Sequence, residues 1–175
     1  TLQHQLITTD ILDFGAGVVV FDYDNDGYDD FYVTNSKGPN ALYRNLSDAT
    51  FEDVADISGV ADPLGVANGG CAADYDNDGN KDLFVTNYGV SKLFRNVGGG
   101  QFEDVTDHRF SGSHGSHRSM GCAWGDFDLD GFVDLVIVRH MNTEGAIDWG
   151  PHVFGDLVDH LVLYHNNGDG YFEDV

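Results

Sequence analysis

The chain has 175 residues, of which 41% are hydrophobic and 13% aromatic, which is sufficient for one globular domain with a sizeable core. This content of large apolar side chains excludes an intrinsically disordered chain, although Asp and Glu number 30 against 8 Lys and Arg. The formal net charge of −22 makes nucleic acids and anionic membrane surfaces unfavourable partners.

The first repeat of the chain, about residues 1–54, contains four candidate strands. Each is a short β-branched or aromatic run bounded by turn-forming residues, and together they cover 17–21, 31–34, 41–45 and 51–54. An acidic loop separates the first strand from the second. Its nine positions read Asp22-Tyr-Asp24-Asn-Asp26-Gly-Tyr28-Asp-Asp30.

The same order of elements returns in the second repeat, about 55–105, and in the third, about 106–175. The second set of candidate strands covers 70–73, 83–86, 92–96 and 102–105, and the third covers 121–124, 135–138, 161–166 and 172–175. The acidic loops are Asp74-Tyr-Asp76-Asn-Asp78-Gly-Asn80-Lys-Asp82 and Asp126-Phe-Asp128-Leu-Asp130-Gly-Phe132-Val-Asp134.

The repeat period is 52 residues, both from Asp22 to Asp74 and from Asp74 to Asp126. This length accommodates a sheet of four short strands, and nothing between the strands has the length or the 3.6-residue periodicity of a helix. The sequence therefore predicts an all-β fold of three four-stranded antiparallel β-propeller blades. Because propellers need roughly four to eight blades, we expect either a fragment of a longer chain or a chain that completes the ring as an oligomer.

Each acidic loop has the residue types that a calcium ion prefers. Carboxylates at positions 1, 3 and 5 point toward one centre, glycine at position 6 permits a sharp reversal, and the carbonyl at 7 and the Asp at 9 complete an oxygen shell. We therefore predict three Ca²⁺ sites. Their ligands are Asp22, Asp24, Asp26, Tyr28, Asp30, Asp74, Asp76, Asp78, Asn80, Asp82, Asp126, Asp128, Asp130, Phe132 and Asp134, with position 7 contributing its backbone carbonyl.

Two other interpretations of the loops were weighed. An EF-hand requires a Glu at position 12 and flanking helices, but position 12 is Val33, Val85 or Ile137 and lies inside a candidate strand. A simple hairpin turn explains one copy of Asp-Asn-Asp-Gly. It does not explain why all three copies add an Asp at position 9.

The two cysteines, Cys71 and Cys122, match no metal-binding or redox spacing. Cys71 precedes its acidic loop by three residues and Cys122 precedes its loop by four, so we expect them on opposite sides of equivalent strands. A disulfide between them stays open as an alternative, and buried free thiols are favoured.

Asn45 begins the glycosylation sequon Asn45-Leu-Ser47. It aligns with Asn96 and Asn166 of the later repeats, and neither of these is part of a sequon. A turn residue of the repeat is therefore favoured over a glycosylated side chain.

The recurring pattern resembles the FG-GAP/VCBS repeat family, and within it the branch of cartilage acidic protein and its bacterial relatives. The pattern consists of a small-residue strand, Asp-x-Asp-x-Asp-Gly-x-x-Asp, an aliphatic strand, a Leu-Tyr-Arg-Asn-like strand and Phe-x-Asp-Val, and it covers nearly the whole chain. The resemblance implies an extracellular calcium-binding β-propeller with an ion in the loop between the first two strands of each blade. It implies ligation by the four Asp of each loop and by the position-7 carbonyls.

Two segments interrupt the repeat, at 108–119 and at an insertion of about 140–160. Strand alternation places both on the face opposite the acidic loops, where irregular insertions commonly carry recognition. We expect either a surface for a protein or glycan ligand, with Trp149 as a stacking platform, or a cap over an exposed blade edge. A transition-metal site at His114 and His117 is a less favoured alternative. The side chains of interest are His108, His114, His117, His140, Trp149, His152, Phe154 and His160.

The leading functional hypothesis is a non-enzymatic calcium-binding module for recognition, adhesion or extracellular assembly. No nucleophile elbow, HExxH motif or phosphate-binding loop is found. The alternative is an accessory propeller of a larger secreted enzyme that acts on polysaccharide or lipid. Such calcium loops suit millimolar calcium, so an extracellular or periplasmic location is expected. No apolar run long enough to insert into a membrane and no signal peptide is visible.

Overall fold

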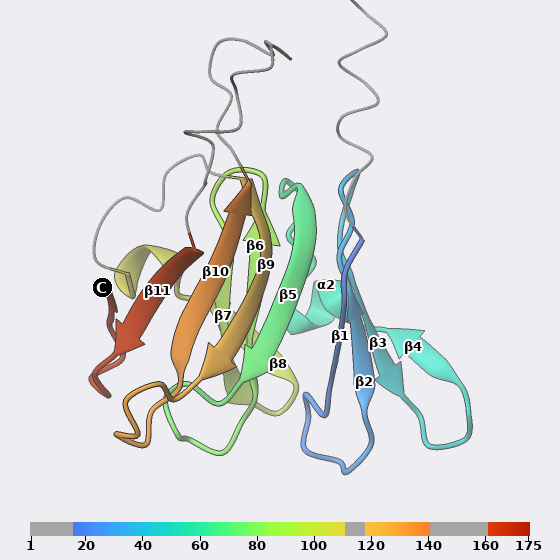
Figure 1. Cartoon of the computed structure of the whole chain (residues 1–175). Coiled ribbons are helices and arrows are strands. Elements are labelled where there is room, and N and C mark those ends of the chain that lie inside the picture. Colours follow the sequence, from blue (N-terminus) through green and yellow to red (C-terminus); the bar gives the residue numbers. More distant parts are fainter. Residues whose placement is uncertain (1–15, 111–117, 141–160) are drawn as a thin grey trace, which may run out of the picture.

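The computed structural model describes residues 16–110, 118–140 and 161–175. Their twelve strands form three four-stranded antiparallel sheets, and within each sheet the strands follow one another in chain order (Figure 1). This confirms the predicted all-β fold of propeller blades, here as an open arc of three. The first sheet comprises β1 (Val18–Phe21), β2 (Asp30–Val33), β3 (Ala41–Asn45) and β4 (Phe51–Asp53).

The second and third sheets repeat this arrangement with longer inner strands. The second comprises β5 (Ala67–Ala73), β6 (Asp82–Asn87), β7 (Lys92–Gly98) and β8 (Gln101–Asp104), and the third β9 (Arg118–Gly125), β10 (Asp134–His140), β11 (Leu161–Asn166) and β12 (Phe172–Asp174). β5 and β9 begin three residues earlier than expected, because each pairs along the full length of the strand that follows it, with one register shift.

In the segments that the structure describes, two single-turn helices lie between the blades, where the sequence predicted none. They are α2 (Ala55–Ser58) and the 3₁₀ helix η2 (Thr106–His108). α2 ends at Gly59, whose φ of 84° is in the left-handed region that favours glycine. One turn is too short to show a 3.6-residue pattern in the sequence, which explains why neither helix was predicted.

The blades pack face to face through their side chains. β1 lies against β5, and β5 lies against β9. Leu83 and Val85 of β6 contribute to the core between the first and second blades, whereas Phe84 contributes to the core between the second and third. β6 is therefore buried on both faces, while β1 alternates exposed and buried residues.

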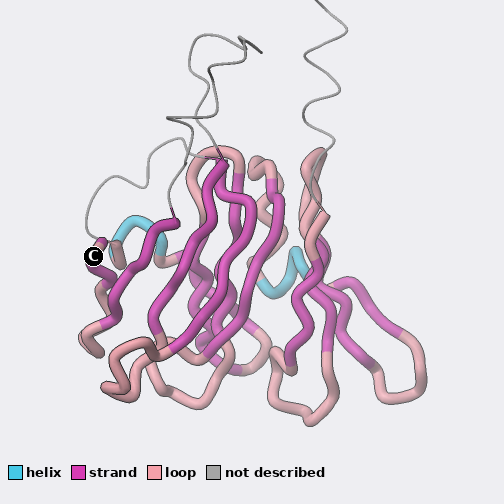
Figure 2. The backbone as a smooth tube through the Cα atoms, viewed as in Figure 1, coloured by secondary structure: helices cyan, strands magenta, loops and turns pink. Residues whose placement is uncertain are grey.

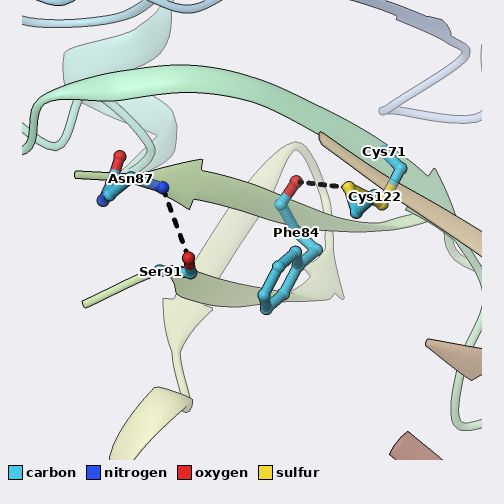
Figure 3. The surroundings of a disulfide bond; sticks show 5 residues. All are labelled: Cys71, Phe84, Asn87, Ser91 and Cys122. Atoms are coloured by element: carbon cyan, nitrogen blue, oxygen red, sulfur yellow. Dashed lines mark hydrogen bonds between the residues drawn. A yellow bond between two sulfur atoms is a disulfide. The ribbon is translucent and has the colours of Figure 1, made fainter. Parts of the chain in front are cut away.

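Cys71 and Cys122 form a disulfide between β5 and β9, with their Cα atoms 5.8 Å apart (Figure 3). The expectation of free thiols was wrong, although the expected opposite orientation of the two side chains explains the bond. Adjacent blades face each other with opposite sides of equivalent strands, so an offset of one residue turns both sulfur atoms toward the same interface. Both cysteines pack against the core between the second and third blades.

All three acidic loops lie on one side of the molecule, at the bottom of the view in Figure 2. This common placement follows from the strand order, because each loop joins the first strand of its blade to the second.

The two segments that interrupt the repeat contain the residues for which recognition was expected. Six of these eight residues lie outside the described residues: His114, His117, Trp149, His152, Phe154 and His160. The side chains of His108 and His140 lie outside them as well. The expected recognition surface therefore stays a prediction.

Candidate metal centres

The first acidic loop is folded by its own carboxylates. Asp22 accepts hydrogen bonds from the backbone N–H groups of Asp26 and Gly27, at 3.1 and 2.9 Å. Gly27 has a φ of 90°, and Asn25 also has a positive φ, of 59°. These left-handed positions reverse the chain around the carboxylates, as a glycine at position 6 suggested.

The second and third loops repeat this geometry. Asp74 accepts from the N–H groups of Asp78 and Gly79 at 3.0 and 2.9 Å, and Asp126 accepts from those of Asp130 and Gly131 at 3.2 and 3.0 Å. The position-5 Asp of every loop accepts from the N–H of position 7. Three loops with different neighbours thus adopt one conformation, which their shared sequence determines.

The Asp at position 9 joins each loop to the rest of its blade. Asp82 is fully buried and accepts from the N–H of Tyr75 at 3.0 Å and from the N–H of Asn96 at 2.8 Å. Asp30 and Asp134 are also fully buried and make the equivalent pairs of bonds in their own blades. These carboxylates therefore fix the position of the loop relative to the third strand.

Burial raises the pKa of Asp82 to about 7, because desolvation disfavours the charged carboxylate and the charges of Asp76 and Asp78 add repulsion. Its two backbone hydrogen bonds oppose the shift without cancelling it. The pKa of Asp30 in the first blade is also raised, mainly by desolvation. A cation beside these carboxylates would favour their charged form, which is the form that binds metal.

In each loop, three of the four candidate carboxylates lie close together. Ligand atoms of positions 1, 3 and 9 lie within 4.8 Å of one another in the first and third loops, and so do those of positions 1, 3 and 5 in the second. One carboxylate oxygen of Asp24 and one of Asp76 are buried and accept no hydrogen bond from the described part of the chain. An oxygen-rich set with unsatisfied buried carboxylate oxygens fits a calcium ion, which neutralises and coordinates them.

A positively charged side chain also approaches positions 3 and 5, and the sequence analysis did not identify it. Arg44 on β3 forms ion pairs with Asp24 and Asp26, at 2.8 and 3.6 Å. Arg95 on β7 makes the same pair with Asp76 and Asp78, at 2.6 and 3.1 Å. The signal was present in the sequence, because both arginines occupy one position of the Leu-Tyr-Arg-Asn strand.

In the third blade the equivalent position is His165. Its Nε2 lies 3.1 Å from Asp128 Oδ2 and 3.9 Å from Asp130 Oδ2. The third loop therefore has a different side chain against the same two carboxylates.

Asparagines connect the loops of neighbouring blades, a role that sequence reasoning also missed. Asn96 Nδ2 donates to the carbonyl of Tyr23 in the first loop, and Asn166 Nδ2 donates to that of Tyr75 in the second, both at 2.8 Å. Asn45 Nδ2 donates to Asp29 of its own loop, at 3.1 Å. The alignment of the three asparagines that favoured a repeat residue thus corresponds to a shared structural position.

Comparison with known proteins agrees with this repeated geometry. A family profile described as FG-GAP-like repeat matches residues 22–85 and again 74–137, which together span more than half of the chain. The chain belongs to the FG-GAP-like repeat family. Each match begins at the first Asp of an acidic loop and ends within the second strand of the following blade.

Curated relatives include cartilage acidic protein 1 of Xenopus tropicalis and of Homo sapiens. Each is 34% identical to this chain over 101 residues, a stretch that covers 55% of the chain. The same stretch covers only 16% and 15% of the two relatives. The similarity thus concerns the repeat and not the whole of either relative.

A solved structure of a lectin from Agrocybe aegerita aligns with 93% of this chain and 39% of its own, with a TM-score of 0.54. Its title describes specific recognition of non-reducing terminal N-acetylglucosamine. The two sequences are 19% identical, so the likeness shows the shared β-propeller fold. Among the described residues, no helix combines the length and apolar character needed to span a membrane.

Proposed function

We propose that this chain is a non-enzymatic recognition or adhesion module whose blades are held in shape by three calcium ions, one in each acidic loop. The observation that carries the proposal is the buried, unbonded carboxylate oxygen of Asp24 and of Asp76, each beside other carboxylates of its loop. Leaving such oxygens without a partner is costly, and a bound cation removes that cost.

Charge repulsion gives calcium a structural role in this proposal. Close carboxylates repel one another by roughly 1 to 4 kcal/mol per pair, depending on their exposure to water. A site at a calcium concentration a hundredfold above its Kd contributes about 2.7 kcal/mol of stability, and three sites about 8 kcal/mol. That sum is comparable with the whole free energy of unfolding of a typical domain.

Calorimetric titration of the chelated protein with CaCl₂ tests the proposal directly. We expect three equivalents of calcium and a melting temperature that rises by more than 10 °C, because each kcal/mol corresponds to about 2–4 °C in a domain of this size. An unchanged melting curve in excess EGTA, together with no heat of binding, would contradict it.

Single substitutions at position 3 assign the ions to their loops. Asp24→Asn, Asp76→Asn and Asp128→Asn should each remove one equivalent, because position 3 contributes an oxygen that the other ligands cannot replace. Glu52→Gln makes the same change in charge at an exposed residue of β4 outside the loops, and it should retain all three equivalents. If Glu52→Gln lost as much calcium as the loop variants, general charge and not the loops would hold the ions.

The proposed location is extracellular or periplasmic, where calcium concentrations suit sites of this kind. The FG-GAP-like repeats and the lectin's propeller fold support a recognition role, with a protein or glycan as the ligand class. A glycan array probed with the calcium-loaded protein tests whether the ligand is a glycan. Binding that persists in EGTA at an unchanged level would show that recognition does not require the ions.

The open faces of the outer blades are proposed to take further blades, either from a longer chain or from copies of this one. Val18 and Val20 are more than half exposed on β1, and Leu161 is 66% exposed on β11. Equivalent faces inside the arc are buried cores. Light scattering with and without calcium tests whether several copies of this chain associate through these faces. A monomer under both conditions would contradict such association.

A further inference from the structure

The third acidic loop differs from the first two in the side chain that faces its carboxylates. Arg44 and Arg95 occupy that place in the first and second blades, and His165 occupies it in the third. An arginine offers only donors and carries its charge permanently, so it cannot coordinate a metal ion. A neutral imidazole has one nitrogen with a free electron pair. This nitrogen makes histidine the commonest nitrogen ligand of zinc and of similar transition-metal ions.

We propose that His165, Asp128 and Asp130 form a binding site for a borderline divalent cation of the zinc class, a capacity that the first two loops lack. Ligand atoms of the three side chains all lie within 4.8 Å of one another. The inference deepens the proposed cation site of the third loop and rests on it, since Asp128 also belongs to the predicted calcium ligands.

The separations between the ligand atoms suit a small ion. Two ligands about 2.1 Å from one tetrahedral zinc ion are about 3.4 Å apart. His165 Nε2 is 3.1 Å from Asp128 Oδ2 and 3.9 Å from Asp130 Oδ2, which brackets that separation. Small rotations of exposed side chains would therefore bring all three atoms to one ion.

The imidazole is held in place, but its metal-facing nitrogen is not satisfied. The His165 ring contacts the ring of Phe127 edge to face, with centroids 5.6 Å apart. Nε2 is shielded from solvent and makes no aligned hydrogen bond with the described residues, although Asp128 lies close to it. A bound cation would give this nitrogen a partner and would also reduce the repulsion between the two carboxylates.

The ligand set also determines which ion is favoured. Carboxylates alone select calcium, magnesium or manganese, whereas an added imidazole favours zinc, nickel or copper. Asp128 and Asp130 are about one third exposed, so an ion can reach them from solvent. The other two loops keep their arginines and should remain restricted to hard cations.

Calorimetric titration of the chelated protein with ZnCl₂ tests the inference, using His165→Arg to give the third loop the side chain of the first two. Loss of a residue that only hydrogen-bonds to a metal ligand lowers metal affinity about 10–100-fold. His165 is proposed as a direct ligand, so we expect His165→Arg to lower the affinity for one zinc equivalent by at least about 10-fold. His165→Gln, which keeps a polar side chain without the imidazole, should do the same. Unchanged zinc affinity in both variants would overturn the proposal.

Arg95→His provides the reciprocal test, because it gives the second loop the ligand set of the third. We expect it to add one zinc equivalent to those of the wild-type protein, and an unchanged stoichiometry would count against the geometric argument. Histidines elsewhere contribute equally to all the variants and cancel in the differences. The resonance of His165 Nε2 in ¹⁵N NMR spectra should shift on addition of zinc.

Calcium titrations of the same variants separate this inference from the proposed function. If the inference fails and the proposed function holds, His165→Arg still binds three calcium ions and zinc binding is unaltered by the substitution. If the proposed function fails, none of the loops responds to calcium, while the zinc difference between wild-type protein and His165→Arg is still measurable.

Discussion

The middle blade and the outer blades have the same strand order but different surroundings. The second sheet packs against a neighbour on each face, so every residue of β6 is buried. Within the described part of the chain, the first and third sheets each have one packed face and one open face, and every second residue of β1 is exposed. One repeat sequence therefore produces two kinds of strand, and the number of neighbours decides which.

The disulfide is the largest expected difference between the two interfaces. It joins the middle blade to the third, whereas no disulfide joins the middle blade to the first, since the chain has only two cysteines. With a sequence separation of 51 between the cysteines, the bond should contribute about 4 kcal/mol by restricting the unfolded chain. Cys71→Ala combined with Cys122→Ala should lower the free energy of unfolding, measured in urea, by about this amount.

The reductant-treated wild-type protein is the control for that double variant, because both lack the bond. Hydrogen exchange should accelerate more in β5 and β9 than in β1 and β2. Equal acceleration in all four strands would show that the bond stabilises the chain as a whole and not one interface.

A matched pair of leucines tests the burial difference itself. Leu83 on β6 is fully buried, and Leu161 on β11 is 66% exposed on an outer blade. We expect Leu83→Ala to cost about 3 kcal/mol, since it leaves a cavity in the core, and Leu161→Ala to cost about 0.5 kcal/mol or less. Urea unfolding measures both, and a comparable loss for Leu161→Ala would reveal that the open face is covered in solution.

Titration of Asp82 should make the chelated protein less stable as the pH rises. Its folded-state pKa of about 7 lies above its value in the unfolded chain, so its contribution is favourable at low pH and is lost as the pH approaches 7. The expected loss between pH 5.5 and 7.5 is about 2 kcal/mol. Melting curves in EGTA at the two pH values measure it.

The net charge of −22 changes stability in the same direction, so a variant must separate the two effects. Asp82→Asn has no carboxyl group to titrate at this position and should show a smaller dependence on pH than the wild-type protein. An identical dependence would assign the whole effect to general repulsion. In saturating calcium the loss should disappear, because the ion favours the charged carboxylate.

The smallest expected effect is the difference in stability lost when Asn96 of the middle blade or Asn45 of the first blade is replaced. Asn96 is fully buried and donates to the loop of the neighbouring blade. Asn45 is partly exposed, and its side chain donates to its own loop but to no other described blade. We expect Asn96→Ala to cost about 1–2 kcal/mol, because it leaves a buried carbonyl without its donor, and Asn45→Ala to cost less. Thermal unfolding measures both, and equal losses would contradict a role between blades.

The strands and the loops could be predicted because both depend on nearby residues. Short β-branched runs between turn formers define the strands, and Asp74, Gly79 and Asp82 define a loop through contacts within nine residues. The arginines at 44 and 95 and the asparagines at 96 and 166 were missed, because their partners are strands or whole blades away. Their recurrence at one repeat position was the available signal.

The cysteines show most clearly where local reasoning stops. The sequence placed Cys71 and Cys122 on opposite sides of equivalent strands, and that inference agrees with the interface that both now share. What it could not supply was the face-to-face packing of blades, which turns opposite sides toward each other.

The repeat period, the strand order and the acidic loops were determined by the sequence alone. Tertiary structure decided which faces meet, because contacts between blades join residues about 50 positions apart and leave no pattern within one repeat.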